Sequence, residues 1–462
     1  MSAVARWQLA AFFALLIGLG ILSFDRASRG RFDFHHFYLD ARYVWEHGAL
    51  NPTVTPHITA ETRQLPFYLP VVSLALAPLA ALGRMPAAAL WTVGQVAALA
   101  YAVWALRRWT ESGGGRPQGR PSGDEGRRPP AADAGVGRHG LALAVVLALP
   151  AFIEAARFNQ VSYFVLALVF GGFSGLERGR DVRAGVCFGL AAVLKLLPGF
   201  LLVWLLLKRR WLAAGACVLT ALVMTIVPPL LAFGPTRTWA YHRDWLDYNL
   251  HGDAGQGLLR ADLPEHFIDR RNQSIAQVLA RLTWSQHPYR TAWQPVTLDS
   301  QTCQRIAAGS SLALLAALVW TTRRPWAALT AGQRQAEAAA YALAMLALSP
   351  LVRQYYLVWA LPALVWLARR ALEPPIRTPH ASAGPHGQPG LPLAWRARIA
   401  TKFNVHAGRL GLAIWLLGMA LWPWPAARVV GVHLVMLLLL GGIIMVSARV
   451  ARTAGANDGL PK

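Results

Sequence analysis

Charge is scarce in this chain, and acidic residues are scarcer still. Only 15% of its 462 residues are charged, whereas 55% are hydrophobic, and 22 Asp and Glu stand against 45 Lys and Arg. A water-soluble protein of this length needs more polar surface than this composition supplies. We find no segment that forms a soluble globular domain with its own core. A soluble enzyme is therefore excluded.

Cysteine is also rare. The three residues, Cys187, Cys217 and Cys303, are widely separated along the chain. Three scattered thiols exclude both a disulfide framework and a cysteine-based metal quartet.

Long apolar runs are what the chain has instead, and its mean hydropathy is +0.36. The clearest runs cover residues 5–24, 86–106, 141–153, 161–173, 211–233, 304–320, 355–367, 410–422 and 430–446. They predict an all-α integral membrane protein with about twelve transmembrane helices. The first run lacks a small-residue cleavage site, so we interpret it as a retained helix rather than a signal peptide.

The net charge of +23 follows the predicted membrane topology. Residues 107–138 carry seven arginines against four acids, and residues 369–409 carry seven basic residues against one acid. Residues 24–66 and 234–302 are balanced. Because cytoplasmic loops are enriched in Lys and Arg, the first pair is expected inside and the second pair outside, with both termini cytoplasmic. We therefore expect membrane lipids, and no nucleic acid, as partners.

The chain divides into three predicted regions. Residues 1–370 form the membrane module, with outer loops 24–85 and 234–302 and a disordered cytoplasmic loop at 107–138. Residues 371–408 form a basic cytoplasmic linker, and residues 409–462 form a transmembrane pair with a short tail. Within the first outer loop, residues 68–83 are interpreted as an interfacial hairpin or helix broken by Pro70 and Pro78.

A lysine lies at a predicted turn between two short apolar helices. Basic flanks bound residues 184–211 on both sides, so the chain is expected to cross outward and return at Lys195–Gly199. A lysine at membrane depth is costly unless it is paired, which makes Lys195 a functional candidate.

The segment after the first span, RFDFHHFYLDARYVWEHG, has helical periodicity. Apolar residues at 34, 37, 41, 44 and 45 share one face, and polar residues at 33, 36, 40, 43 and 47 share the other. We predict an amphipathic helix in the outer interface. Asp33 is either a helix N-cap or a general base. His36 between Asp33 and Asp40 leaves a metal site as an alternative, although we expect none.

Further polar groups recur at the outer ends of spans. They lie in EAARFNQ at 154–160, RRNQS at 270–274 and SPLVRQYY at 349–356. Each group can be a cap or an interfacial anchor. Together with Lys195 they form a surface suited to a lipid whose phosphate is a leaving group.

The order of these motifs resembles the polytopic C-type (GT-C) glycosyltransferases that use polyprenyl-phosphate sugars. It is most similar to glycosyltransferase family 87, over roughly residues 5–370. The matching residues are Asp33, Tyr38, Ala41 and Gly48, then Tyr68 and Pro70, Gln160, Lys195 to Pro198 with Arg210 and Trp211, Asn272 to Ser274, and Ser349 with Pro350. Arg353 stands where the family commonly has Trp, and Tyr355 where it has His.

The resemblance implies a GT-C-like fold and a catalytic aspartate at Asp33. It also implies a substrate site, which we expect to contain His36, Tyr38, Asp40, Gln160, Lys195, Asn272, Gln273, Arg353, Tyr355 and Tyr356. The expected activity is inverting transfer of a sugar, mannose or arabinose with mannose preferred. The donor is a polyprenyl-phosphate sugar, and the acceptor is a hydroxyl of an envelope glycolipid or polysaccharide. Neither a cofactor nor a metal is expected.

Two alternatives stay open at this point. A transporter of lipids or lipid-linked sugars would also have many spans and buried cations, but its polar residues should line a path across the bilayer. The polar residues of this chain gather at one face, which favours the transferase. The altered motifs at Gln160 and Tyr355 also allow a family member retained as a scaffold. The Ala-, Arg- and Pro-rich composition suggests a GC-rich bacterial genome, and hence the bacterial plasma membrane.

Overall fold

A computed structural model of the chain describes residues 3–50, 68–112, 131–247, 271–291, 294–373, 391–429 and 431–455. Within these ranges the protein is helical, and the one β-type contact is an isolated bridge between Trp284 and Leu298. The prediction of an all-α protein is confirmed for this part of the chain. The helices are α1 (Ala3–Ser28), α2 (Asp33–His47), α3 (Pro70–Ala81), α4 (Arg84–Ser112), α5 (Ala131–Leu147), α6 (Leu149–Phe158), α7 (Ser162–Glu177), α8 (Asp181–Leu194), η1 (Leu197–Phe200), α9 (Leu201–Leu207), α10 (Trp211–Leu246), α12 (Ile275–Thr283), α13 (Ser300–Thr322), η3 (Trp326–Ala328), α14 (Ala331–Ala347), η4 (Gln354–Ala360), α15 (Leu361–Leu372), α16 (Leu391–Leu421), α17 (Pro425–Val429) and α18 (Val432–Gly455).

Five of the described helices are long and apolar enough to cross a membrane, namely α1, α4, α10, α13 and α16. The bent pair α5–α6, with an angle of 51° between its halves, makes a sixth when it is counted as one span. The shorter apolar helices are α3, α7, η1 together with α9, and part of α18. The chain is therefore a multi-pass membrane protein, and the total of twelve spans stays a prediction.

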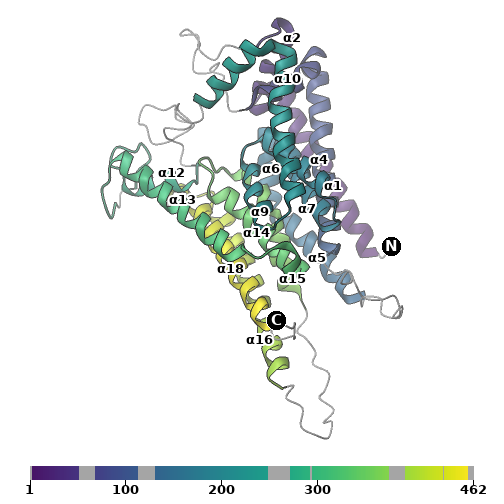
Figure 1. The fold of residues 1–462 in the computed structure, drawn as a ribbon, viewed down its shortest axis with the longest axis vertical. Helices are drawn as coiled ribbons and strands as arrows, with labels where there is room; N and C mark the ends of the chain where they lie inside the picture. Colours follow the sequence, from purple (N-terminus) through teal and green to yellow (C-terminus); the bar gives the residue numbers. More distant parts are fainter. Residues whose placement is uncertain are drawn as a thin grey trace.

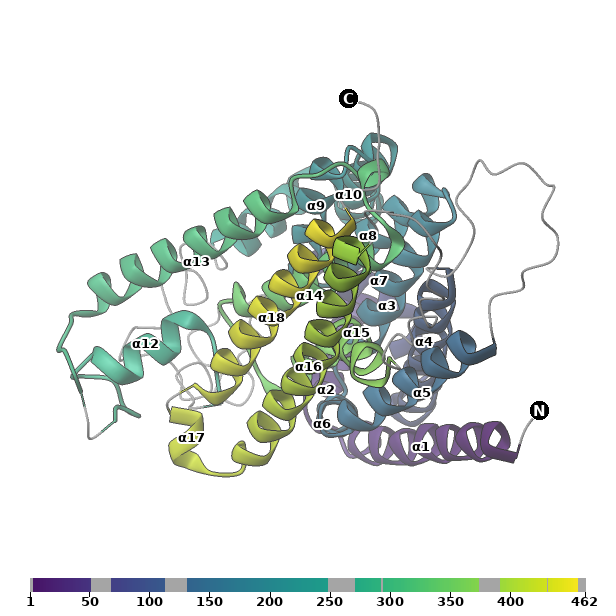
Figure 2. The ribbon, with the colours of Figure 1, turned by 90° about the horizontal axis from the view of Figure 1, so that it is seen from below.

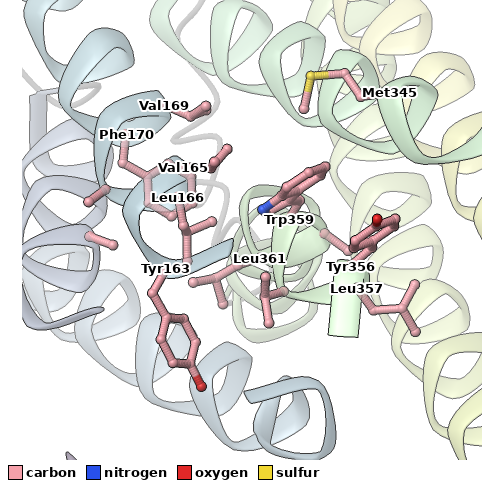
Figure 3. Packing of buried hydrophobic residues seen from close by; sticks show 14 of the residues in the cluster. Tyr163, Val165, Leu166, Val169, Phe170, Met345, Tyr356, Leu357, Trp359 and Leu361 are labelled. Carbon is pink, nitrogen blue, oxygen red and sulfur yellow. The ribbon is translucent and has the colours of Figure 1, made fainter. Parts of the chain in front are cut away.

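The core lies among α7, α14 and α15, whose side chains are buried around almost the whole helix. By contrast, α1 and α10 keep apolar side chains exposed, as expected of helices that face lipid. Figure 2 shows α1 at one edge of the molecule and α13 at the other, with α14 and α15 between them. In the core, the rings of Tyr356 and Trp359 are parallel, and they belong to the same buried cluster as Tyr163 and Phe170 of α7 (Figure 3).

The predicted out-and-back turn is present. Helix α8 ends where Lys195 adopts an extended conformation, and η1 and α9 then return the chain. At the other end of α8, Arg210 forms an ion pair with Asp181. Since α8 has 14 residues, its two ends lie roughly 20 Å apart at 1.5 Å per residue. Lys195 and the basic flanks therefore lie at opposite ends of the bundle.

Several predicted boundaries are wrong. Pro78 does not break α3, because a single helix continues to Ala81. The predicted end of the span at residue 233 is correct, by contrast: α10 leaves helical geometry at Gly234, whose φ is 74°, and a further helical segment continues to Leu246. Residues 131–138 and 391–408, predicted as loop and linker, are helical. The rest of those two segments, 113–130 and 374–390, lies outside the described residues, as do residues 51–67 and 248–270 of the two outer loops and the last residues of the predicted tail.

The segment predicted as the first outer loop packs at one end of the bundle. Helix α2 packs on α3, and both lie beside the upper half of α10 (Figure 1). Phe34, Phe37, Ala41 and Val44 of the predicted apolar face are buried, whereas Trp45 is 58% exposed. The amphipathic pattern of the helix is therefore confirmed, except that its buried face ends before Trp45, and its place at the membrane interface stays a prediction.

Candidate active site

Asp33 is the first residue of α2. Gly30 and Phe32, with φ of 63° and 62°, turn the chain sharply between α1 and α2. The N-cap position belongs to Phe32, and no side chain caps the helix. The alternative role of Asp33 as N-cap is therefore wrong. Its carboxylate is instead free to accept a hydrogen bond from the side-chain amide of Gln160.

Gln160 connects Asp33 to Lys195. It follows Asn159, which ends α6 in the left-handed conformation with φ of 54°. The Gln160 amide nitrogen donates to Asp33, and its amide oxygen accepts from the Lys195 ammonium at 3.3 Å. A carboxylate and an ammonium that are distant in sequence are thereby held on either side of one neutral amide.

Aromatic rings surround the Lys195 ammonium. Its Nζ lies 3.7 Å from the ring centre of Tyr356, 5.2 Å from Trp359 and 5.9 Å from Tyr355. The faces of aromatic rings attract cations, which stabilises an ammonium taken out of water. The Tyr355–Tyr356 pair therefore contributes to the site through Lys195, and Trp359 is a member that sequence reasoning missed.

Arg353 brings a second cation to this region. It is the N-cap residue of η4, three residues before Tyr356, whose backbone N–H donates to the Arg353 carbonyl at 2.9 Å. Burial raises the pKa of Asp33, and the positive charge of Arg353 opposes that rise. Two cations thus lie near one carboxylate.

Burial shifts the pKa values of both Asp33 and Lys195. Desolvation raises the pKa of Asp33 to about 6, although Lys195, Arg353 and the hydrogen bond from Gln160 oppose the shift. Desolvation lowers the pKa of Lys195 to about 7, although Asp33 opposes this shift. Both groups therefore change charge close to neutral pH, as catalytic acids and bases often do.

The arrangement suits group transfer from a lipid phosphate. Asp33 can accept a proton, and Lys195 and Arg353 can neutralise a phosphate. The apolar surroundings strengthen these electrostatic interactions because water does not screen them.

The side-chain amides of Asn272 and Gln273 form hydrogen bonds with backbone groups. Asn272 is fully buried; its Oδ1 accepts from the backbone of Val352 at 3.0 Å, and its Nδ2 donates to the carbonyl of Pro350 at 3.2 Å. Gln273 donates to the Arg428 carbonyl at 2.8 Å. The Asn272 side chain therefore braces the segment that carries Arg353, whereas the Gln273 side chain contacts the backbone near Arg428 and only its backbone N–H donates to Val352. The following Ser274 is the N-cap of α12.

The remaining predicted residues lie on α2. Tyr38 is buried in the contact of α2 with α4, where Phe34 packs against Trp91. His36 is exposed, and Asp40 is partly buried, which raises its pKa to about 7. Among the described residues, no three His, Cys, Asp or Glu side chains are grouped closely enough to hold a metal. The structure therefore does not bring His36, Tyr38 or Asp40 into the Asp33–Gln160–Lys195 chain.

The model of glycosyltransferase family 87 matches residues 67–353 of this chain. The match includes Gln160, Lys195 and Arg353. Asp33 precedes it, so its predicted role depends on the resemblance described above and on the geometry of the site.

Two curated relatives are similar to part of the chain. Both are named polyprenol-phosphate-mannose-dependent alpha-(1-2)-phosphatidylinositol mannoside mannosyltransferase. The protein from Mycobacterium tuberculosis is 29% identical over 48% of this chain and 46% of its own length. The protein from Mycolicibacterium smegmatis is 28% identical over 49% of this chain and 46% of its own length. The chain thus spans about half the length of these relatives. No solved structure shows a significant match.

Proposed function

The chain belongs to glycosyltransferase family 87, and from that premise we propose that it transfers mannose from a polyprenyl-phosphate donor to a hydroxyl of an envelope glycolipid. The names of both relatives support the donor and the lipid class of the acceptor. We place the reaction at the extracytoplasmic face of the bacterial plasma membrane, because the charge distribution of the loops favours that side for Asp33 and Lys195.

The observation that carries this proposal is the hydrogen-bonded chain from Asp33 through Gln160 to Lys195. In the proposed reaction the acceptor oxygen forms a bond to the anomeric carbon while the bond from that carbon to the phosphate oxygen breaks. The electron pair leaves with the polyprenyl phosphate, whose charge Lys195 and Arg353 neutralise. The proton of the acceptor hydroxyl passes to the Asp33 carboxylate, which later releases it to water.

Replacing the base tests this mechanism. The protein is purified into lipid with radiolabelled polyprenyl-phosphate mannose and a membrane glycolipid extract. Asp33→Asn keeps the shape of the side chain but cannot take up a proton, so transfer should fall by about a hundred- to ten-thousand-fold. The matched control is Asp244→Asn, which changes a carboxylate on α10 that is 54% exposed and should leave transfer at the parent rate.

Two outcomes would contradict the proposal. Parent-level transfer by correctly folded Asp33→Asn would exclude Asp33 as the base. Movement of the labelled lipid across the bilayer without any sugar transfer by the parent would favour the transporter.

A further inference from the structure

Three buried polar side chains lie behind the candidate active site. Ser23 on α1, Gln95 on α4 and Asn159 at the end of α6 are 2%, 1% and 0% exposed. Ser23 and Gln95 lie within helices apolar enough to span the membrane. Polar groups buried in such helices are costly unless they are hydrogen-bonded, and those that are present often serve function.

Hydrogen bonds join these side chains to one turn. The Gln95 amide donates to the backbone carbonyl of Gln160 at 3.0 Å. The Ser23 hydroxyl lies 2.6 Å from the Asn159 amide oxygen and 3.1 Å from that of Gln95. The Asn159 amide donates back to the Ser23 carbonyl at 3.2 Å. Helices α1, α4 and α6 therefore all hold the turn formed by Asn159 and Gln160.

This turn decides where the Gln160 side chain lies. Asn159 adopts the left-handed conformation, which an unsupported non-glycine residue seldom keeps. The Gln160 amide can bridge Asp33 and Lys195 only while its backbone stays between them, because the hydrogen bonds are directional. The charges alone favour one orientation of the amide, with its nitrogen toward the carboxylate. The position of the amide depends on the buried contacts.

We propose that Ser23, Gln95 and Asn159 are positioning residues for sugar transfer, which hold the turn so that Gln160 keeps the Asp33 base and the Lys195 cation in register. The inference rests on the proposed function, because its effect on rate is an effect on the Asp33-dependent reaction. It adds to that function a buried support that reaches into two membrane-spanning helices.

The charged and titratable neighbours of Asp33 come from several elements. They are Lys195 in the turn after α8, Arg353 and Tyr355 at the start of η4, and Tyr68 before α3. Gln160 contributes a hydrogen bond that lowers the pKa of Asp33. When the support is lost and Gln160 moves away, the carboxylate loses this donor, and its pKa should rise further.

Gln95→Leu is the direct test, because leucine has a similar volume and no amide. We expect kcat at pH 7 to fall by about tenfold or more, and the acidic limb of the rate profile to move up by about one pH unit. The matched control is Thr92→Val, one turn earlier on α4, since the buried Thr92 hydroxyl makes no hydrogen bond in the structure. Its rate and pH profile should equal those of the parent.

Ser23→Ala provides a second variant in case Gln95→Leu fails to fold, and it should shift the acidic limb in the same direction. Parent-like acidic limbs in the folded Gln95→Leu and Ser23→Ala variants would overturn the inference. A loss of rate that only follows the loss of folded protein would overturn it as well, because that is a purely structural effect.

A readout that needs no transfer separates this inference from the proposed function. The pKa of Asp33 is raised from 3.8 to about 6, so its contribution to stability is complete below about 3.8 and is lost as pH rises through about 6. The difference in Tm between the parent and Asp33→Asn should change over this window. In the Gln95→Leu background the upper end of this window should move to higher pH, while the lower end, set by the unfolded chain, stays in place. If the parent transfers no mannose, the proposed function fails. Independently of that result, a pH window that is unchanged in the Gln95→Leu background would overturn the positioning role.

Discussion

At the scale of single residues, the candidate site depends on Asp33 and Lys195, and the burial of each side chain disfavours its charged form. The Asp33 carboxylate is easier to protonate than in water, and the Lys195 ammonium is easier to deprotonate. Their mutual attraction and the Gln160 amide partly offset this cost. The proposed reaction needs both charges at once, because in it one group accepts the proton and the other neutralises the phosphate. The usable pH range should therefore be narrow.

We predict a bell-shaped pH dependence of kcat/KM for mannose transfer. Below about 6 the rate should fall as Asp33 is protonated, by about tenfold per pH unit. Above about 7 it should fall as Lys195 loses its proton. The two limbs describe the coupled pair, since each charge shifts the other. Steady-state rates between pH 4.5 and 9, roughly the range in which the groups titrate, measure the profile.

The Lys195→Arg variant distinguishes the acidic limb of the pH profile from the alkaline limb. Arginine stays protonated throughout this range, so the alkaline limb should disappear while the acidic limb stays in place. A rate that stays constant well below pH 6 in the parent would contradict the assignment of Asp33 as base.

At the scale of elements, the position of Lys195 depends on how closely α8 approaches α10. Gly189 of α8 lies against the backbone of α10: an added Cβ would lie 2.6 Å from the carbonyl oxygen of Cys217 and 2.8 Å from the Cβ of Thr220. Two helices can approach this closely only where one of them lacks a side chain. The glycine therefore determines where the C-terminal end of α8, and with it Lys195, lies.

Gly189→Ala should push α8 away from α10. Overpacking of this kind costs about 1–3 kcal/mol, so Tm should fall, and the KM for the donor should rise because Lys195 moves. The control is Gly215→Ala on α10, where an added Cβ meets nothing within 4 Å. That change should be neutral or stabilise the helix by up to about 1 kcal/mol. Thermal unfolding in detergent and donor titrations measure both variants, and an unchanged Tm for Gly189→Ala would refute the close-packing argument.

At the scale of the whole molecule, a second set of charges lies at the end of the bundle away from Lys195. Lys208 and Glu337 are buried, with Nζ and Oε2 2.5 Å apart, and Lys208 also donates to the Arg324 carbonyl at 2.8 Å. Nearby, Arg334 pairs with Glu177 at 2.8 Å. These contacts join α7, α9 and α14, so we interpret this cluster as a structural anchor.

Glu337→Leu should destabilise the protein strongly, because it leaves the Lys208 ammonium buried without its carboxylate. Breaking a buried pair in this way costs about 3–5 kcal/mol. Adding Lys208→Met should restore most of the loss, since an apolar pair of similar volume carries no desolvation cost. Glu111→Gln, which removes an exposed carboxylate paired with Arg107, is the control and should change stability by less than about 1 kcal/mol. If the Glu337→Leu variant alone is as stable as the parent, the anchor contributes little to the stability of the protein.

Much of this architecture could be predicted from the sequence. Apolar periodicity predicted the helical membrane protein and the amphipathic helix that begins at Asp33, and the basic flanks of residues 184–211 predicted the turn at Lys195. These features depend on local composition and on a burial pattern that repeats along one segment. Boundaries were less predictable: Gly234 interrupts α10 as a usual helix breaker should, whereas Pro78 lies inside α3, which continues through it.

The partners of individual side chains could not be predicted in the same way. Gln95 is a single amide within an apolar run, Trp359 resembles any core aromatic, and Asn272 resembles a site residue although its amide is saturated by backbone groups. Sequence by itself determined which segments form apolar helices and which polar residues lie at their ends, because both follow from local hydrophobicity and charge. Only the tertiary structure decided that Asp33, Gln160 and Lys195 meet, because hydrogen bonds between residues far apart in the chain depend on how the helices pack.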